Sequence, residues 1–227
     1  LVRNRPLRIL SFFFVIAFTT MSISNAADSY FMSYNIGATP MMTTVFMWLG
    51  TIPAFIFLPL LPSIKRKIGK AAMFRLFLGI SIVGMILMYV IVSIPSLSSC
   101  FPLVCAIQFI KSVGILVATG YMWALVPEVV TFGEYTTGRR VAAIVNAIIC
   151  IFMKAGMALG GVIPGFVLAW VGFNASNQVQ TPLAQQGILW LVTLIPAALF
   201  LLATFVIGKY ELSDEKMDEI NSSITNK

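Results

Sequence analysis

The sequence GEYTTGRR at residues 133–140 leads into a long apolar run that carries Lys154 and ends at Gly160-Gly161. This run is too apolar for a helix in water, and its lysine is too polar for contact with lipid. An ionisable side chain inside a membrane span is costly, and such residues mark ion or substrate pathways. The stretch therefore predicts a transmembrane helix whose lysine has a function, held in place by the rest of the chain.

The composition of the whole chain supports a membrane protein. Of its 227 residues, 59% are hydrophobic and only 10% are charged, whereas soluble domains carry about 25% charged residues. The apolar runs are long and do not alternate with polar residues, so they differ from the segments of about ten residues that form membrane barrels. The predicted fold class is an all-α membrane protein.

The apolar runs divide the chain into six predicted transmembrane helices. Each is near or above the about 20 residues that cross the hydrocarbon core. The expected organisation is a six-helix bundle over residues 1–209, followed by a polar, solvated tail over 210–227. The chain begins with Leu1 and lacks the features of a signal peptide, so we expect that it starts within a longer protein. The spans are residues 7–35, 41–62, 71–94, 101–126, 141–170 and 186–208.

The basic residues are distributed unevenly around these spans. Thirteen of the fifteen lie at the chain ends or in connections on one side of the bundle, and the connections on the other side hold no Lys or Arg. This asymmetry predicts that both ends of the chain are cytoplasmic. The net charge of +7 is then explained by basic residues that fix the orientation of the spans in the membrane. No nucleic-acid partner is expected.

The two remaining basic residues, Lys111 and Lys154, fall inside spans. Lys154 lies about 20 Å along its helix, so its side chain is expected to face protein or water. Small residues share its face of the helix, which leaves two alternatives open: space for a ligand, or a seam for close helix packing. That face comprises Ala143, Ala147, Cys150, Lys154, Ala158 and Gly161.

Two other spans carry polar residues: Lys111 is expected near mid-depth in its span, and Asp28 toward the outer end of the first span. Gln108 precedes Lys111 by about one helical turn, and Asn25 precedes Asp28 by the same spacing on another span. An internal ion pair between Asp28 and one of the lysines is one open alternative. One lysine would still lack a counter-ion, which predicts a carboxylate from outside this chain or an anionic substrate.

The inventory of reactive groups argues against an enzyme. The chain contains no histidine, and Cys100, Cys105 and Cys150 are too scattered to form a metal motif. No nucleophile–base pair or phosphate-binding loop is present. We therefore expect no enzymatic activity, no metal site and no cofactor.

Several motifs are similar to those of a known transporter family. Residues 132–140, FGEYTTGRR, and residues 152–161, FMKAGMALGG, resemble the C-terminal half of the glycoside–pentoside–hexuronide:cation symporters. These are melibiose-carrier-like members of the major facilitator superfamily. Residues 163–166 and 177–182 are most similar to the glucuronide carrier branch, and the resemblance extends over essentially the whole chain.

The resemblance implies a carrier of twelve helices in a bacterial inner membrane, of which this chain supplies helices seven to twelve. A sugar or glycoside, moved together with Na⁺ or H⁺, is expected to bind between this bundle and an N-terminal half that carries most cation ligands. Lys154 corresponds to the family's lysine linked to both sites. The substrate and coupling candidates are Lys154, Asp28, Lys111, Asn25, Gln108 and Asn146, and the candidates for a conformational loop are Glu128, Glu134, Tyr135, Arg139 and Arg140.

The sequence also departs from the family pattern. Pro127-Glu128 replaces the usual Ala-Asp, Thr131 replaces an acidic residue, and Asn146 stands where a serine is common; Lys111 is not part of the pattern. These changes leave the substrate and the coupling ion open. Two other functions stay as alternatives: a truncated, non-transporting membrane scaffold, and a carrier of lipid-like amphiphiles.

Overall fold

The computed structural model describes residues 4–138, 142–177, 179–210, 212 and 214–225. The ordered elements within these ranges are all helical, which confirms the predicted fold class. Among the described residues, six helical stretches are long and apolar enough to cross a membrane. They are Arg5–Ile36, Pro40–Ile68, Lys70–Val92, Phe101–Thr137, Ala142–Trp170 and Pro182–Ile207.

Several of these stretches are built from more than one helical segment. Three of them start with a capping side chain followed by proline: Asn4, Thr39 and Thr181 each accept a hydrogen bond from a backbone N–H three residues later. The segments, in chain order, are α1 (Arg5–Tyr30), the π-helical turn Phe31–Ile36, α2 (Pro40–Phe57), the 3-10 turn Leu58–Leu60, α3 (Leu61–Ile68), α4 (Lys70–Val92), α5 (Pro95–Ser98), α6 (Phe101–Tyr121), the 3-10 turn Met122–Leu125, α7 (Val126–Thr137), α8 (Ala142–Trp170), α9 (Pro182–Val192), α10 (Leu194–Ile207) and α11 (Asp214–Thr225).

Two predicted connections are largely helical. Most of 62–70 belongs to α3, and α7 occupies 126–137 where a loop was expected. Each helix has its proline in the first turn, where a missing N–H is harmless, and a glycine with positive φ follows each one (Gly69, 78°; Gly138, 69°). The prediction of a conformational loop is therefore wrong for Glu128, Glu134 and Tyr135, which lie on α7, whereas Arg139 and Arg140 lie outside the described residues.

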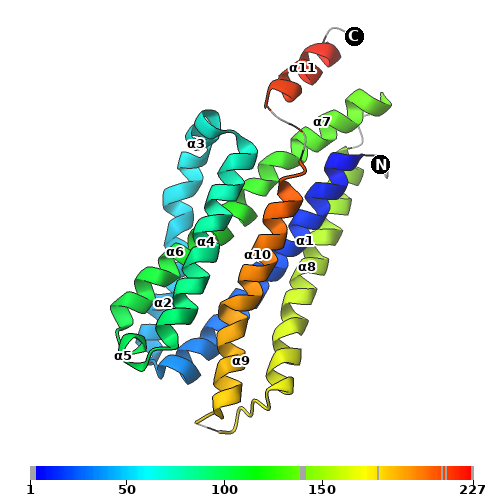
Figure 1. Cartoon of the computed structure of the whole chain (residues 1–227). Helices are drawn as coiled ribbons and strands as arrows, with labels where there is room; N and C mark the ends of the chain where they lie inside the picture. Colours follow the sequence, from blue (N-terminus) through cyan, green and yellow to red (C-terminus); the bar gives the residue numbers. More distant parts are fainter. Residues whose placement is uncertain (1–3, 139–141, 178, 211, 213, 226–227) are drawn as a thin grey trace.

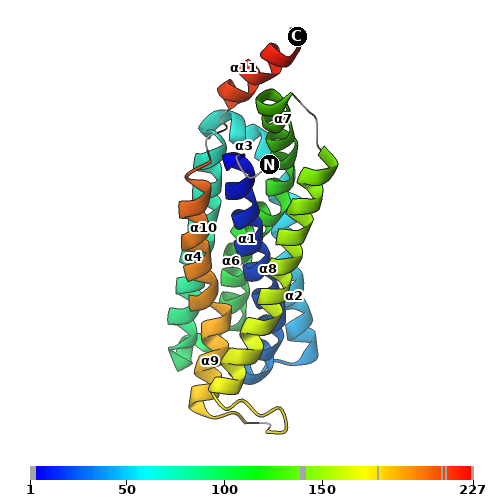
Figure 2. The same ribbon diagram turned by 90° about the vertical axis from the view of Figure 1, so that its right-hand side faces the viewer.

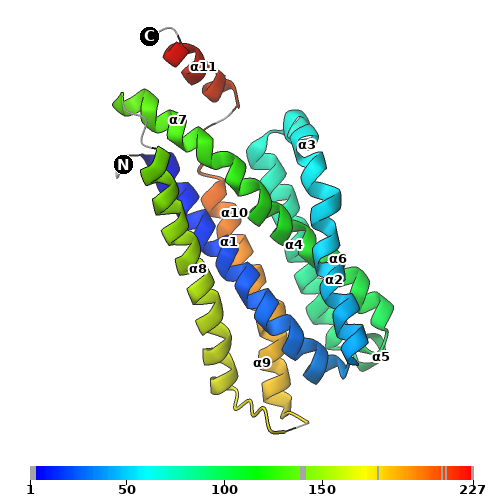
Figure 3. The ribbon, with the colours of Figure 1, turned by 180° about the vertical axis from the view of Figure 1, so that it is seen from behind.

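Helix α1 forms the centre of the bundle. It packs most extensively against α8 and also against α10, α9 and α6. Figure 1 shows α4 and α10 on the near side of the bundle, and Figure 3 shows α1 in front of α9 and α10, with α2 in front of α4. In Figure 2, α10, α1 and α8 lie side by side. The described N-terminal end, α7 and α11 all lie at one end of the bundle (Figure 1), which we call the basic end because Lys65, Arg66, Lys67 and Lys70 also lie there.

Glycines allow the closest helix crossings. A Cβ at Gly156 of α8 would lie 2.6 Å from the Val15 carbonyl oxygen of α1, and one at Gly160 would lie 2.7 Å from the Thr19 carbonyl oxygen. The Thr19 hydroxyl donates a hydrogen bond to the Gly156 carbonyl at 3.0 Å. These contacts place the α1–α8 seam on the buried face of α8, because small residues let helix backbones approach.

The C-terminal segment differs from the solvated tail that was expected. Leu212, Met217 and Ile220 are buried in a small cluster with Phe132 of α7 and Tyr210. Met217 and Ile220 are three residues apart and therefore lie on one face of α11. The tail is thus a helix that packs on the basic end of the bundle.

Candidate functional site

A buried ion pair lies between α1 and α6. The Lys111 ammonium is 2.8 Å from Oδ1 of Asp28, and the Gln108 amide donates to Oδ2 of the same carboxylate at 3.0 Å. Lys111 is fully buried and Asp28 is 5% exposed. The Lys111 nitrogen also lies 5.9 Å from the centre of the Phe46 ring of α2, within the range of a cation–π contact. Three predicted site residues therefore form one arrangement.

A cavity of about 220 Å³ with both polar and apolar lining residues opens beside this pair. Two buried polar atoms on its wall, the Ser24 hydroxyl and Oε1 of Gln108, have no hydrogen-bond partner in the structure. Buried polar groups are normally paired, and a bound ligand or water is one of the ways that pairing is achieved. The cavity lining comprises Met21, Ser24, Asn25, Asp28, Met47, Gly50, Thr51, Gln108, Lys111, Ser112, Ile115 and Leu116, from α1, α2 and α6.

The ion pair answers one question that the sequence left open. Asp28 pairs with Lys111, so the internal pair is the alternative that the structure contains. Lys154 makes no ion pair with any described residue. The surplus positive charge among the intramembrane residues thus resides on Lys154.

Lys154 lies on the exposed face of α8. Its side chain is exposed, as are Ala143, Ala147 and Ala158 of the same face. The close-packing seam instead involves the other face, which carries Gly156 and Gly160. Within the described chain, the small residues around Lys154 therefore do not form a helix-packing seam. This face is free to meet lipid, a ligand or another polypeptide.

Asn146 lies two helical turns before Lys154 and is also exposed. Its amide donates to the Ala142 carbonyl of its own helix at 3.0 Å, and Asn146 does not line the cavity beside Asp28. Asn25, in contrast, does line that cavity. The predicted substrate residues thus divide into a cavity group on α1 and α6 and an exposed group on α8.

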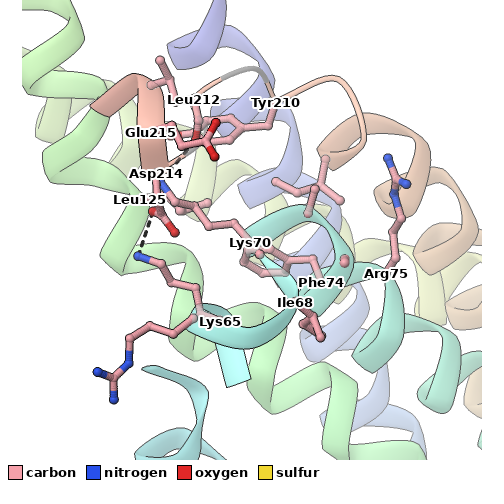
Figure 4. Close-up of a pocket in the computed structure, with 15 residues that line it drawn as sticks. Lys65, Ile68, Lys70, Phe74, Arg75, Leu125, Tyr210, Leu212, Asp214 and Glu215 are labelled. Atoms are coloured by element: carbon pink, nitrogen blue, oxygen red, sulfur yellow. Dashed lines mark hydrogen bonds and ion pairs between the residues drawn. The ribbon is translucent and has the colours of Figure 1, made fainter. Parts of the chain in front are cut away.

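A second charged cluster lies at the basic end (Figure 4). The Lys70 ammonium is 2.7 Å from Glu128 of α7. It is also 2.9 Å from Asp214 of α11 and donates to the Leu212 carbonyl at 3.2 Å, and these residues are drawn in Figure 4. Lys65 is 2.9 Å from the same Asp214 oxygen. The cluster therefore joins α3, α4, α7 and the tail helix.

Two groups of this cluster outside the membrane-spanning stretches have shifted pKa values. Burial alone would raise the pKa of Asp214, but hydrogen bonds from Lys65 and Lys70 outweigh it and hold that pKa below its usual range. Burial raises the pKa of Tyr210, and the Glu128 carboxylate, which accepts a hydrogen bond from the tyrosine hydroxyl at 3.3 Å, raises it further. Near neutral pH, Asp214 is charged and Tyr210 is protonated.

Sequence reasoning missed several of these residues. Ser24 was not singled out, although it lies four residues before Asp28 and so on the same helix face. Asp214 and Lys70 were assigned to a solvated tail and to a connection, because nothing local indicates a contact between residues 144 positions apart in the sequence. Glu134 of α7 is half-buried and makes an interaction of its own, whereas Tyr135 is 45% exposed.

The described residues contain no group of three or more His, Cys, Asp or Glu side chains that could hold a metal ion. Asp28 is already neutralised by Lys111.

Comparisons with known proteins identify the family. The family model described as MFS/sugar transport protein matches residues 1–214. The chain is 39% identical over 224 residues to the uncharacterized symporter YnaJ of Bacillus subtilis, covering 99% of this chain and 47% of that protein. It is 32% identical over 227 residues to the glucuronide carrier protein homolog of Escherichia coli, covering 100% of this chain and 48% of the relative.

A third relative, the uncharacterized symporter YjmB of Bacillus subtilis, is 30% identical over 221 residues, which are 96% of this chain and 46% of that protein. The chain therefore spans about half the length of the curated relatives that it matches. These relatives are named as transporters rather than enzymes, and the six spans make the chain a multi-pass membrane protein. The chain belongs to the MFS/sugar transport protein family.

Proposed function

We propose that this chain is the C-terminal half of a secondary carrier that moves a glycoside with an acidic group, such as a glucuronide, together with Na⁺ or H⁺. The observation that carries the proposal is the Lys154 cation, which lies on the exposed face of a membrane helix without a carboxylate partner among the described residues. An unpaired charge at that depth is costly, so an anion that binds there is strongly favoured. The glucuronide carrier homolog among the relatives supports this class of substrate.

The cavity beside Asp28 suits the hydroxyl groups of a sugar. Gln108 and Ser24 offer buried oxygens without partners, and Asn25, Thr51 and Ser112 add polar groups along the wall. At about 220 Å³, the cavity is smaller than typical ligand pockets of about 300–1,000 Å³. We infer that it is one wall of a larger site, which is completed by an N-terminal half of six helices.

The proposed coupling mechanism follows from the different surroundings of the two intramembrane lysines, Lys111 and Lys154. Alternating access in such carriers is a rocking of two bundles around a central site. Asp28 is held by Lys111 within one bundle, whereas Lys154 faces outward and is free to meet either a carboxylate of the other half or the substrate anion. Exchange between these two partners would link substrate binding to the movement of the halves.

The test compares anionic and neutral glycosides in the carrier assembled from this chain and its N-terminal half. We expect Lys154→Gln to reduce cation-coupled uptake of a glucuronide by about tenfold or more. This is the effect expected when one charge-assisted hydrogen bond to the substrate is lost. Lys67→Gln, which removes an exposed lysine at the basic end, should leave uptake unchanged. Equal glucuronide uptake by wild type and Lys154→Gln would contradict the role of Lys154, and the absence of cation-coupled uptake in both would favour a scaffold.

A further inference from the structure

A groove at the basic end, between α1 and α10, has an unusual charge distribution. Its volume is about 370 Å³, and none of the residues that line it is acidic. The larger pocket of about 570 Å³ at the same end is different, because there Lys65 and Lys70 are bound to Asp214. The groove is lined by Arg5, Arg8, Ile9, Phe12, Val206 and Lys209.

The two walls of the groove, α1 and α10, have the same arrangement: a basic residue near the basic end and an apolar residue farther from it. On α1, Arg8 is followed by Phe12 one turn deeper; α10 arrives at this end with Val206, and Lys209 follows three residues later. The two helices run in opposite directions and meet at this end (Figure 2). Each wall therefore has a cation toward the basic end and an apolar side chain about one turn farther into the bundle.

Two of the three cations in the groove, Arg8 and Lys209, lack a counter-ion within the described chain, whereas Arg5 makes an interaction of its own. Neither Arg8 nor Lys209 makes an ion pair with a described residue, and both are exposed. Like charges that share a groove repel each other, and an anion between them removes that repulsion. The groove is thus complementary to a negative charge at its outer end.

The deeper part of the groove suits a hydrocarbon chain. Phe12 is 58% exposed, and Ile9 and Val206 also line the groove. A free anion or an acidic peptide would use only the cations and would leave these apolar surfaces without a matching group. A molecule with an anionic head and an apolar tail fits both parts.

We propose that this groove is a binding site for an anionic phospholipid of the surrounding bilayer. Arg8 and Lys209 contact the phosphodiester, with Arg5 beside them, and an acyl chain lies along Ile9, Phe12 and Val206. Basic pockets between transmembrane helices bind acidic headgroups in this way. Bound lipid would hold the start of α1 against the end of α10, independently of any transported substrate.

The experiment measures lipid retention by the chain itself. The protein is reconstituted in phosphatidylcholine bilayers that contain phosphatidylglycerol, released in mild detergent, and weighed by native mass spectrometry. We expect the wild type to retain phosphatidylglycerol in preference to phosphatidylcholine. The double variant Arg8→Gln/Lys209→Gln should retain about tenfold less, because each basic residue near an acidic headgroup contributes to binding.

The matched control is Arg66→Gln/Lys67→Gln, which removes two exposed cations from the same end of the bundle. Retention by this control should equal that of the wild type, and circular dichroism should show the same helix content in all variants. An equal loss in the control would overturn the proposal in favour of a general charge effect. Displacement of the lipid by millimolar glycerophosphoglycerol, which has the headgroup but no acyl chain, would overturn it in favour of a simple anion site.

Discussion

At the scale of single residues, two intramembrane lysines of the same chain have different surroundings. Lys111 is fully buried and is held by Asp28, whereas Lys154 is exposed. Removing one partner of a buried pair leaves an uncompensated charge, which costs much more than removing both partners. Mutation of the two lysines should therefore affect different properties of the protein.

We expect Lys111→Met to destabilise the purified chain by about 3–5 kcal/mol, because Asp28 is left without its counter-ion. Adding Asp28→Asn should restore most of that loss. Lys154→Met is the control and should change stability by less than about 0.5 kcal/mol, as for other exposed positions. Thermal unfolding in detergent measures all three variants, and a double variant as unstable as Lys111→Met would argue against a structural role for the pair.

The sequence could predict the residue types of this site but not their pairing. Asp28, Lys111, Gln108 and Asn25 were recognised because polar groups are rare in apolar spans. Which lysine meets Asp28 depends on how α1 and α6 are rotated about their axes. That rotation is set by packing against α2, α4 and α8, which involves residues far apart in the sequence.

At the scale of helices, glycine spacing determines how closely α1 and α8 approach. We expect Gly160→Ala to destabilise the chain by about 1–3 kcal/mol, because the new methyl group has no space beside the Thr19 carbonyl. The neighbouring Gly161→Ala is the control: nothing lies within 4 Å of its Cβ position, and alanine favours a helix. Comparison of the thermal unfolding of the two variants separates the effect of steric crowding from that of helix propensity. An equal loss of stability in both variants would contradict the assignment of Gly160 to the close contact between α1 and α8.

The docked tail helix should respond to acid. The pKa of Asp214 is lowered in the folded state, so its contribution to docking is present above the ordinary aspartate pKa of about 3.9 and is lost as the pH falls through the lower, folded value. We expect hydrogen exchange in residues 214–220, corrected for the intrinsic rate, to increase over that interval.

Asp214→Asn should show the faster exchange already at neutral pH. Asp218→Asn changes an exposed acid on the same helix and should retain the wild-type profile. A tail that remains protected in Asp214→Asn would show that the apolar cluster of Leu212, Met217 and Ile220 is sufficient for docking.

Helix existence was easier to predict than helix boundaries. Six spans were expected from apolar length, and the described residues contain six helical stretches that are long and apolar enough to cross a membrane. The expected ends near residues 62 and 126 were wrong because Pro62 and Pro127 start new helical turns instead of ending the span. Gly69 and Gly138, with their positive φ angles, are the actual ends.

At the scale of the whole molecule, the distribution of basic residues predicts orientation. Cys100 is exposed and lies in the connection between α5 and α6, at the end opposite the basic end. If the basic end is cytoplasmic, a membrane-impermeant maleimide should label Cys100 in intact cells. Cys100→Ser should abolish that labelling, since Cys105 is buried and Cys150 is half-buried. Labelling only after permeabilisation would mean that the orientation is reversed.

The contact between Lys70 and Asp214 also affects the order of assembly during synthesis. Glu128 is synthesised before Asp214, which follows Lys70 by 144 residues. Synthesis of those 144 residues takes on the order of ten seconds at translation rates of about 5–20 residues per second. Lys65 lacks its aspartate for the same interval. The charges of this cluster are thus completed only when Asp214 leaves the ribosome, after the span Pro182–Ile207 has been made.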